Sequence, residues 1–387
     1  MKAKLQNFLL VLISLSIALG VGEIAFRVVL PSATNAESNG AQPLEKLIEF
    51  DPKLQTRYRP NVSGLVKSQY GEFEIKYVTN ALGLRDRPLE SDGSQRILVL
   101  GNSLVEGWGV EEEDSFLRVA EQTLNQGRNR HLRLINAGMS GFGAAQSYLL
   151  GCELLEQVKP SAVVFVYIST MVQADYQFLL LADRDANNLA TGLSGDALLN
   201  PPAKAKTRVS ATPAWLKDMA PYSAMARFVE QRLASRAARN AIQPGDPASD
   251  LLAGLRADKD KLAALHAPSL AHVNALAQRA KAKGLPFLLV HLPMPHQLSA
   301  DEWRSGRKAY GLESQVYPAH DVEIVQNFCR ANGIACASAH SYLTQAILDD
   351  PAKNHFYYRF DFHPTVTGYR AIGLWMAMEL KKISLLL

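Results

Sequence analysis

The sequence predicts an α/β fold in which a parallel sheet of about five strands lies between layers of helices. The first observation is that short, continuous apolar runs such as Ile97–Leu100 recur from Arg96 onward. A run that is apolar at every residue is typical of a strand buried on both faces. The second observation is that amphipathic segments of helical length separate these runs, which is typical of parallel sheets covered by helices.

Each expected strand is a short run rich in aliphatic residues, and the five runs are Ile97–Leu100, Leu132–Asn136, Ala162–Ile168, Phe287–Leu292 and Gly333–Cys336. The expected helices are Asp114–Gln126, Ala144–Val158, His272–Lys283, Val322–Asn332 and Thr365–Lys382. Stop signals support these bounds, because Pro160 follows the second helix and Gly284 follows the third. Such sheets bind ligands at the carboxyl ends of their strands, so site residues are expected there.

Residues 1–31 are expected to form an N-terminal transmembrane anchor. Lys2 and Lys4 precede an apolar run that ends at Pro31 and is interrupted by Glu23 and Arg27. A bilayer requires about 20 such residues, and lysines on the short flank favour a cytoplasmic N-terminus. The alternative is a cleaved signal peptide, and either segment would export the body of the chain. We therefore expect a single-pass membrane protein whose body lies outside the inner membrane, on the periplasmic side.

The rest of the chain divides into two regions. Residues 32–95 are expected to form a linker and a small lead-in region, since polar residues give way to short extended pieces with turn signals. Residues 96–387 carry the α/β pattern and are expected to form the main domain. The pattern breaks down over about 183–267, which is interpreted as a helical insertion.

The composition excludes several function classes. The net charge is only +4 over 387 residues, and no Lys/Arg stripe accompanies it, so nucleic acid is not an expected partner. No phosphate-binding or dinucleotide-binding glycine motif is present, and the cysteines Cys152, Cys329 and Cys336 lack metal-ligand spacing. Three free thiols are expected, with a Cys329–Cys336 disulfide as the alternative in an oxidising compartment. No metal or cofactor is expected.

Ser103 is the candidate nucleophile. It follows Gly101 and Asn102 directly after the first buried run, where this fold class exposes its active site. Serine alone is a poor nucleophile and needs a neighbouring base. A serine at a strand end is more often only a helix cap.

The pair Asp361 and His363 near the end of the chain supplies a candidate base. Separated by one residue, both side chains can face the same cleft. The imidazole would accept the serine proton, and the carboxylate would fix its tautomer. The alternative is a capping Asp and a surface His.

A third candidate feature is the small-residue stretch after the second strand, Asn136 to Gly141. Small residues allow backbone N–H groups to approach a ligand closely, and such donors can hold an oxyanion. The alternative is an ordinary tight turn between strand and helix.

Together these motifs resemble the SGNH/GDSL hydrolase superfamily, and a membrane-anchored bacterial member of it. The stretches are ILVLGNSLVEGWGV, INAGMSGFG and DFHPTVTG, with FDPKLQTRYRPN and TNALGLRD before them. The resemblance implies a flavodoxin-like three-layer α/β/α sandwich and a triad of Ser103, His363 and Asp361. It also implies an oxyanion hole that includes Ser103 and Gly141.

Two positions depart from the family pattern. Asn102 stands where the family has Asp before the nucleophile, but this position is not part of the triad. Ser169 and Thr170 stand where the family has a Gly-Asn pair whose amide donates to the oxyanion. Thr170 is shorter, and loss of one such donor costs about 10²–10³ in rate. Thr170 is therefore the expected third donor, with Gln173 or a residue of the insertion as alternatives.

The resemblance implies an exported serine esterase that cleaves an O-acyl ester, such as an O-acetyl group on a cell-envelope glycan or a small acyl ester. One alternative is an O-acyltransferase that uses the same triad to acetylate a polysaccharide. Another is a non-catalytic binding protein on a decayed fold, motivated by Thr170.

Overall fold

A computed structural model of the chain describes residues 2–29, 44–89, 93–127, 131–199, 213–219 and 259–384, and also residues 223, 225–226, 228–230, 232–233 and 236. Its centre is a five-stranded sheet with the order β11–β10–β7–β5–β6, and every neighbouring pair is parallel. The strands are β5 (Gln95–Gly101), β6 (Leu132–Gly138), β7 (Ala162–Tyr167), β10 (Phe287–His291) and β11 (Ala335–Ser338). The predicted parallel sheet of five strands is thus confirmed.

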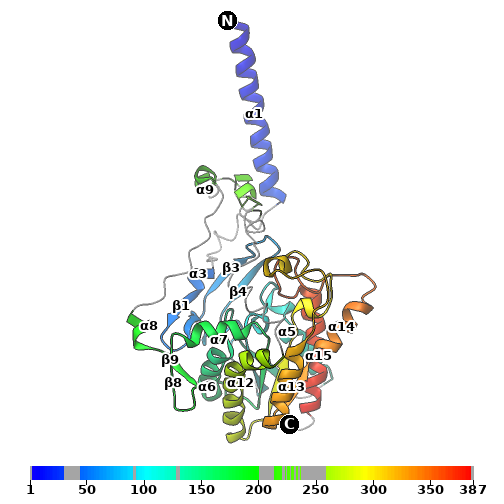
Figure 1. The fold of residues 1–387 in the computed structure, drawn as a ribbon. Coiled ribbons are helices and arrows are strands. Elements are labelled where there is room, and N and C mark those ends of the chain that lie inside the picture. The colour runs from blue at the N-terminus through cyan, green and yellow to red at the C-terminus, as the bar shows by residue number, and fades with distance from the viewer. Residues whose placement is uncertain are drawn as a thin grey trace.

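Helices cover both faces of this sheet (Figure 1). On one face α5 (Phe116–Asn125) packs against α15 (Val366–Ser384). On the other face α12 (Lys259–Ala282) packs against both α6 (Ala144–Val158) and α13 (His320–Asn332). The order of the strands along the chain reverses between β5 and β7, so β5 lies at the position where such sheets usually open a ligand site.

Some helix bounds differ from those expected. Helix α12 begins at Lys259, inside the segment predicted as an insertion, and it continues through Pro268, which weakens the helical pattern in the sequence. Strand β11 begins after Gly333, because Gly333 adopts a φ of 62° and ends α13. Two further helices, α7 (Met171–Leu179) and α14 (His340–Asp349), had no counterpart among the expected elements.

The described part of the predicted insertion contains more than helices. It forms a hairpin of β8 (Ala182–Arg184) and β9 (Ala190–Leu193), followed by α8 (Gly195–Leu199) and α9 (Ala214–Met219). The remainder of the predicted insertion before α12 lies almost entirely outside the described residues.

Helix α1 (Lys2–Val29) covers most of the predicted anchor and extends away from the sheet (Figure 1). Its Glu23 carboxylate accepts hydrogen bonds from Ser223 Oγ at 2.7 Å and from the Met225 amide at 3.1 Å. In the part of the chain that the structure describes, no helix is both long enough and apolar enough to cross a membrane.

The lead-in region forms the short helix α3 (Leu44–Leu47) and two antiparallel pairs, β1 (Ile48–Asp51) with β2 (Gln55–Tyr58), and β3 (Ser63–Lys67) with β4 (Glu74–Val78). The segment after β4 enters the core of the main domain. Arg85 is 1% exposed and donates to the carbonyls of Gly107 at 2.6 Å and Val110 at 2.7 Å. Buried Asp86 accepts from the Asn136 amide at 2.8 Å. The lead-in therefore supports the turn that follows β5 and the strand β6.

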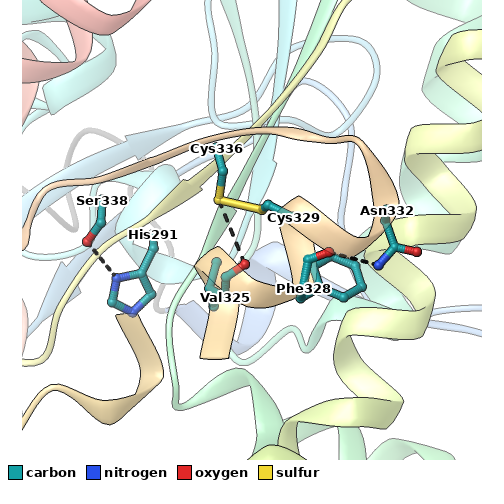
Figure 2. Close-up of a disulfide and its surroundings, with 7 residues drawn as sticks. All are labelled: His291, Val325, Phe328, Cys329, Asn332, Cys336 and Ser338. Atoms are coloured by element: carbon teal, nitrogen blue, oxygen red, sulfur yellow. Dashed lines mark hydrogen bonds between the residues drawn. A yellow bond between two sulfur atoms is a disulfide. The ribbon is translucent and has the colours of Figure 1, made fainter. Parts of the chain in front are cut away.

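Cys329 near the end of α13 and Cys336 in β11 form a disulfide, and their Cα atoms lie 6.1 Å apart (Figure 2). The expectation of three free thiols is therefore wrong for this pair, whereas Cys152 is free. The physical reason is the glycine turn at Gly333, which returns the chain past the last turn of α13. The bridge ties the edge strand of the sheet to the helix that precedes it.

Candidate active site

Ser103 lies at a sharp transition from strand to helix. It is the first residue of α4 (Ser103–Glu106), directly beyond the carboxyl end of β5. The Asn102 side chain caps this short helix by accepting from the Leu104 amide at 3.1 Å. Gly107 ends the helix with a φ of 87°, a conformation that favours glycine. The turn thus fixes Ser103 at the carboxyl edge of the sheet. Ser103 is only 6% exposed there.

His363 reaches Ser103 from the loop that precedes α15. Its Nε2 lies 2.6 Å from Ser103 Oγ, although the two residues are 260 positions apart in the chain. Its Nδ1 makes a short hydrogen bond with Asp361 Oδ1. When Nδ1 carries the proton that it donates to Asp361, Nε2 is free to accept the serine proton. The structure therefore brings the three expected triad residues into one hydrogen-bonded chain.

Asp361 is held by groups on two sides. The Trp108 indole donates to its Oδ2 at 3.3 Å, and the His363 amide donates to its Oδ1 at 3.0 Å. Burial raises the pKa of Asp361, but the charge and hydrogen bonds of His363 lower it by more. The net result is a pKa below its usual value. The carboxylate is therefore ionised at neutral pH and can stabilise an imidazolium.

Aromatic rings enclose the imidazole of His363. The Phe362 ring stacks on it with centroids 4.3 Å apart, and the Trp108 ring lies 6.0 Å away. Trp108 thus contacts both His363 and Asp361, and these contacts restrict the orientation of the imidazole.

Gly141 and Ser103 offer backbone donors for an oxyanion. Gly141 adopts a φ of 81° in the turn after β6. Among the described residues, neither the Ser103 nor the Gly141 amide has a hydrogen-bond acceptor. Unpaired N–H groups at a strand-to-helix turn are suited to bind a developing negative charge.

Thr170 precedes α7 at the end of β7, beside the turn that carries Ser103. Its Oγ1 accepts a hydrogen bond from Asn102 Nδ2 at 3.5 Å. The Thr170 hydroxyl keeps its own proton for donation, because it acts as the acceptor in this contact. The structure thus places Thr170 next to the residue that precedes Ser103.

Thr170→Asn tests whether the short side chain weakens the oxyanion site. We expect kcat for ester hydrolysis to rise, by up to about 10²-fold, because an amide reaches farther than a hydroxyl and one good donor contributes that much. Steady-state kinetics of the two enzymes measure the change. Unchanged or lower kcat would show that Thr170 or another donor already serves the oxyanion.

A buried polar cluster at the same sheet edge was not expected from the sequence. Asp321 accepts from Ser169 Oγ through a short hydrogen bond and from Gln297 Nε2 at 2.8 Å, and its Oδ2 lies 3.1 Å from His291 Nε2. His291 Nδ1 in turn lies 3.1 Å from Ser338 Oγ (Figure 2). Burial raises the pKa of Asp321, but His291, Ser169 and Gln297 lower it below its usual range. The cluster fixes the end of β7 immediately before Thr170.

Glu106 and Glu72 were also missed. Glu106 lies within the stretch ILVLGNSLVEGWGV, but the resemblance assigns it no role, and Glu72 lies in no motif. Glu106 is fully buried, and it accepts from Tyr58 Oη at 2.6 Å and from Ser140 Oγ at 2.5 Å. It thereby joins α4 to the lead-in and to the turn that carries Gly141. In the described part of the chain no cluster of His, Cys, Asp and Glu side chains could hold a metal ion.

No known protein family's sequence profile matches the chain, and no curated protein sequence matches it. Among solved structures, it is similar to the psychrotrophic esterase EstA from Pseudoalteromonas sp., with 13% identity, a TM-score of 0.35, and coverage of 75% of this chain and 98% of that chain. It is also similar to a two-domain esterase active on acetylated mannans, with 12% identity, a TM-score of 0.38, and coverage of 75% and 50%.

A third similar structure is a GDSL-like lipase from Bacteroides thetaiotaomicron, with 14% identity, a TM-score of 0.31, and coverage of 77% of this chain and 92% of that chain. The functional assignment rests on the contacts among Ser103, His363 and Asp361.

Proposed function

We propose that the protein is a serine esterase of the SGNH type that cleaves an O-acyl ester. The observation that carries this proposal is the hydrogen-bonded chain from Ser103 Oγ through His363 to Asp361. A serine, an imidazole and an ionised carboxylate in this order are the groups that acyl transfer through a covalent intermediate requires. The presence of all three groups in hydrogen-bond contact argues against a non-catalytic binding protein.

The first half of the reaction forms an acyl-enzyme. Ser103 Oγ attacks the acyl carbonyl as its proton passes to His363 Nε2, and Asp361 stabilises the resulting imidazolium. The Ser103 and Gly141 amides, together with the Thr170 hydroxyl, hold the oxyanion. Collapse of this intermediate breaks the ester bond, and the leaving alkoxide takes the proton from His363. Water then attacks the acyl-enzyme with His363 as base and restores Ser103.

We propose that the substrate is an ester in which the acyl group is attached to a glycan hydroxyl. Aromatic side chains lie beside the triad, since Trp108 contacts His363. Phe360, which directly precedes Asp361, stacks on Tyr70 of the hairpin between β3 and β4. Aromatic rings that are only half-buried offer flat apolar faces, against which the C–H faces of a sugar can pack.

The substrate proposal is tested by release of acetate from O-acetylated polysaccharide, measured beside p-nitrophenyl acetate. Faster release from the polysaccharide at equal ester concentration supports a glycan ester. If acetate instead appears on an added sugar acceptor faster than in water, the same triad serves an O-acyltransferase. If p-nitrophenyl acetate alone is cleaved, the natural substrate is a small acyl ester.

We also propose that the body of the protein lies outside the cytoplasm, tethered through α1. The Cys329–Cys336 disulfide supports this location, because such bonds persist in oxidising compartments and are rare in the cytosol. Fractionation of cells that express the full chain tests it. Recovery in the membrane fraction, with protease sensitivity in spheroplasts, is expected, and recovery as a soluble cytosolic protein would contradict it.

A further inference from the structure

The hairpin between β3 and β4 reaches the loop that carries the catalytic carboxylate. Its tip, residues 68–73, is closed by a hydrogen bond from the Ser68 amide to the Phe73 carbonyl at 2.9 Å. Within this tip, Glu72 Oε1 accepts from the Phe360 amide at 3.0 Å, and its Oε2 accepts from the Asp361 amide at 3.0 Å. One carboxylate thus binds two successive backbone amides, 288 and 289 positions later in the chain.

Two aromatic residues of the hairpin tip strengthen this contact. Tyr70 stacks on Phe360 with centroids 5.7 Å apart. Phe73 packs edge-on against Trp108, with centroids 5.9 Å apart, and its ring is tilted against that of Tyr358 at 5.3 Å. The hairpin tip therefore contacts both the loop before Asp361 and the indole that donates to Asp361.

Glu72 holds the backbone of Asp361 from outside the loop that carries this residue. Ser305 and Gly306 amides bind the Arg359 carbonyl, but Glu72 is the group that accepts from the Asp361 amide itself. A backbone shift of Asp361 would change the geometry of its hydrogen bond to His363. Misplacement by about 1 Å can cost about 10²-fold in rate even when the chemical groups are intact.

Resting on the proposed esterase activity, we propose that Glu72 is a positioning residue that holds Asp361 in register with His363. Glu72 does not touch the reacting atoms, and its effect passes through the backbone of the catalytic loop. Burial raises the pKa of Glu72, and the Phe360 and Asp361 amides oppose that rise only in part. A raised carboxyl pKa means that ionised Glu72 destabilises the native state relative to protonated Glu72.

Glu72→Ala tests the proposal, with Glu74→Ala as the matched control. Glu74 lies on the same hairpin and pairs with Lys67 at 2.8 Å, away from the catalytic loop. We expect Glu72→Ala to lower kcat for p-nitrophenyl acetate by about 10- to 10²-fold with KM within twofold. Glu72→Gln keeps one accepting oxygen and should give an intermediate kcat, whereas Glu74→Ala should match wild type.

A second measurement does not depend on substrate. The proton that His363 Nδ1 donates to Asp361 should give a strongly downfield ¹H resonance, identified by its loss in His363→Ala. We expect this resonance to move upfield or broaden in Glu72→Ala and to stay in place in Glu74→Ala. An unchanged resonance together with unchanged kcat would overturn the positioning role. An inactive wild type would instead contradict the esterase proposal, and the resonance would still report on Glu72.

Discussion

Asp361→Asn is expected to lower kcat for ester hydrolysis by about 10⁴-fold. The carboxylate receives the Nδ1 proton of His363 and keeps Nε2 free to accept from Ser103 Oγ. An amide at this position can present its NH₂ group to Nδ1, which selects the tautomer that cannot take the serine proton. Steady-state kinetics with p-nitrophenyl acetate at pH 7 to 8 measure the loss.

The control for this variant is Asp349→Asn, at the exposed end of α14, where the carboxylate accepts only from Gln345 at 2.8 Å among the described residues. It should keep wild-type kcat. A loss of less than tenfold in Asp361→Asn would show that Asp361 does not orient the base.

Wild type and Asp361→Asn should also differ in how the free energy of unfolding depends on pH. The pKa of Asp361 lies below its unfolded value, since His363 lowers it more than burial raises it. Such a group stabilises the native state above the unfolded pKa, and this contribution is lost as the pH falls through the folded pKa. The stability difference between wild type and Asp361→Asn should therefore shrink as the pH falls below about 4. A difference that grows on acidification would contradict the direction of the shift.

Arg85→Ala is expected to have the largest effect on stability. The buried guanidinium donates to the carbonyls of Glu106 at 3.1 Å, Gly107 at 2.6 Å and Val110 at 2.7 Å, and it lies 4.0 Å from the Tyr77 ring centroid. Removal leaves three carbonyls without this donor, and each unsatisfied buried group costs about 1–3 kcal/mol. We expect the free energy of unfolding to fall by about 3 kcal/mol or more.

Chemical denaturation measures this loss, and Arg59→Ala is the matched control. Arg59 lies in the same lead-in region, but its side chain is 53% exposed and pairs with Glu49 only at 3.9 Å. Its removal should change stability by less than about 1 kcal/mol. An equal effect of the two substitutions would show that Arg85 does not hold the turn after Ser103.

The sheet could be predicted from the sequence because its strands are buried on both faces. Continuous apolar runs such as Ile97–Leu100 have few other stable placements, and the predicted helix over Ala144–Val158 has the same bounds as α6. The start of α12 could not be predicted, because Pro268 and the polar residues of α12 weaken its helical pattern in the sequence. Packing of α12 against α6 and α13 overrides this local propensity.

The triad residues could be nominated from the sequence because their residue types and order are restrictive. Asp361 and His363 lie in one short motif, and Ser103 follows a strand. Glu72 could not be found in this way, because its role depends on a contact across 289 positions between a hairpin tip and a loop. The Cys329–Cys336 bond likewise depends on how the turn at Gly333 returns the chain.

The most direct test of the serine mechanism compares wild type with Ser103→Ala in p-nitrophenyl acetate hydrolysis, using the full chain in detergent. Ser103 Oγ is the atom that would form the acyl bond, so its removal should lower kcat by at least about 10⁴-fold while the thermal unfolding midpoint stays near that of wild type. Activity that disappears only in the variant would establish Ser103 as the nucleophile. Equal hydrolysis rates by the two proteins would contradict the proposed esterase mechanism.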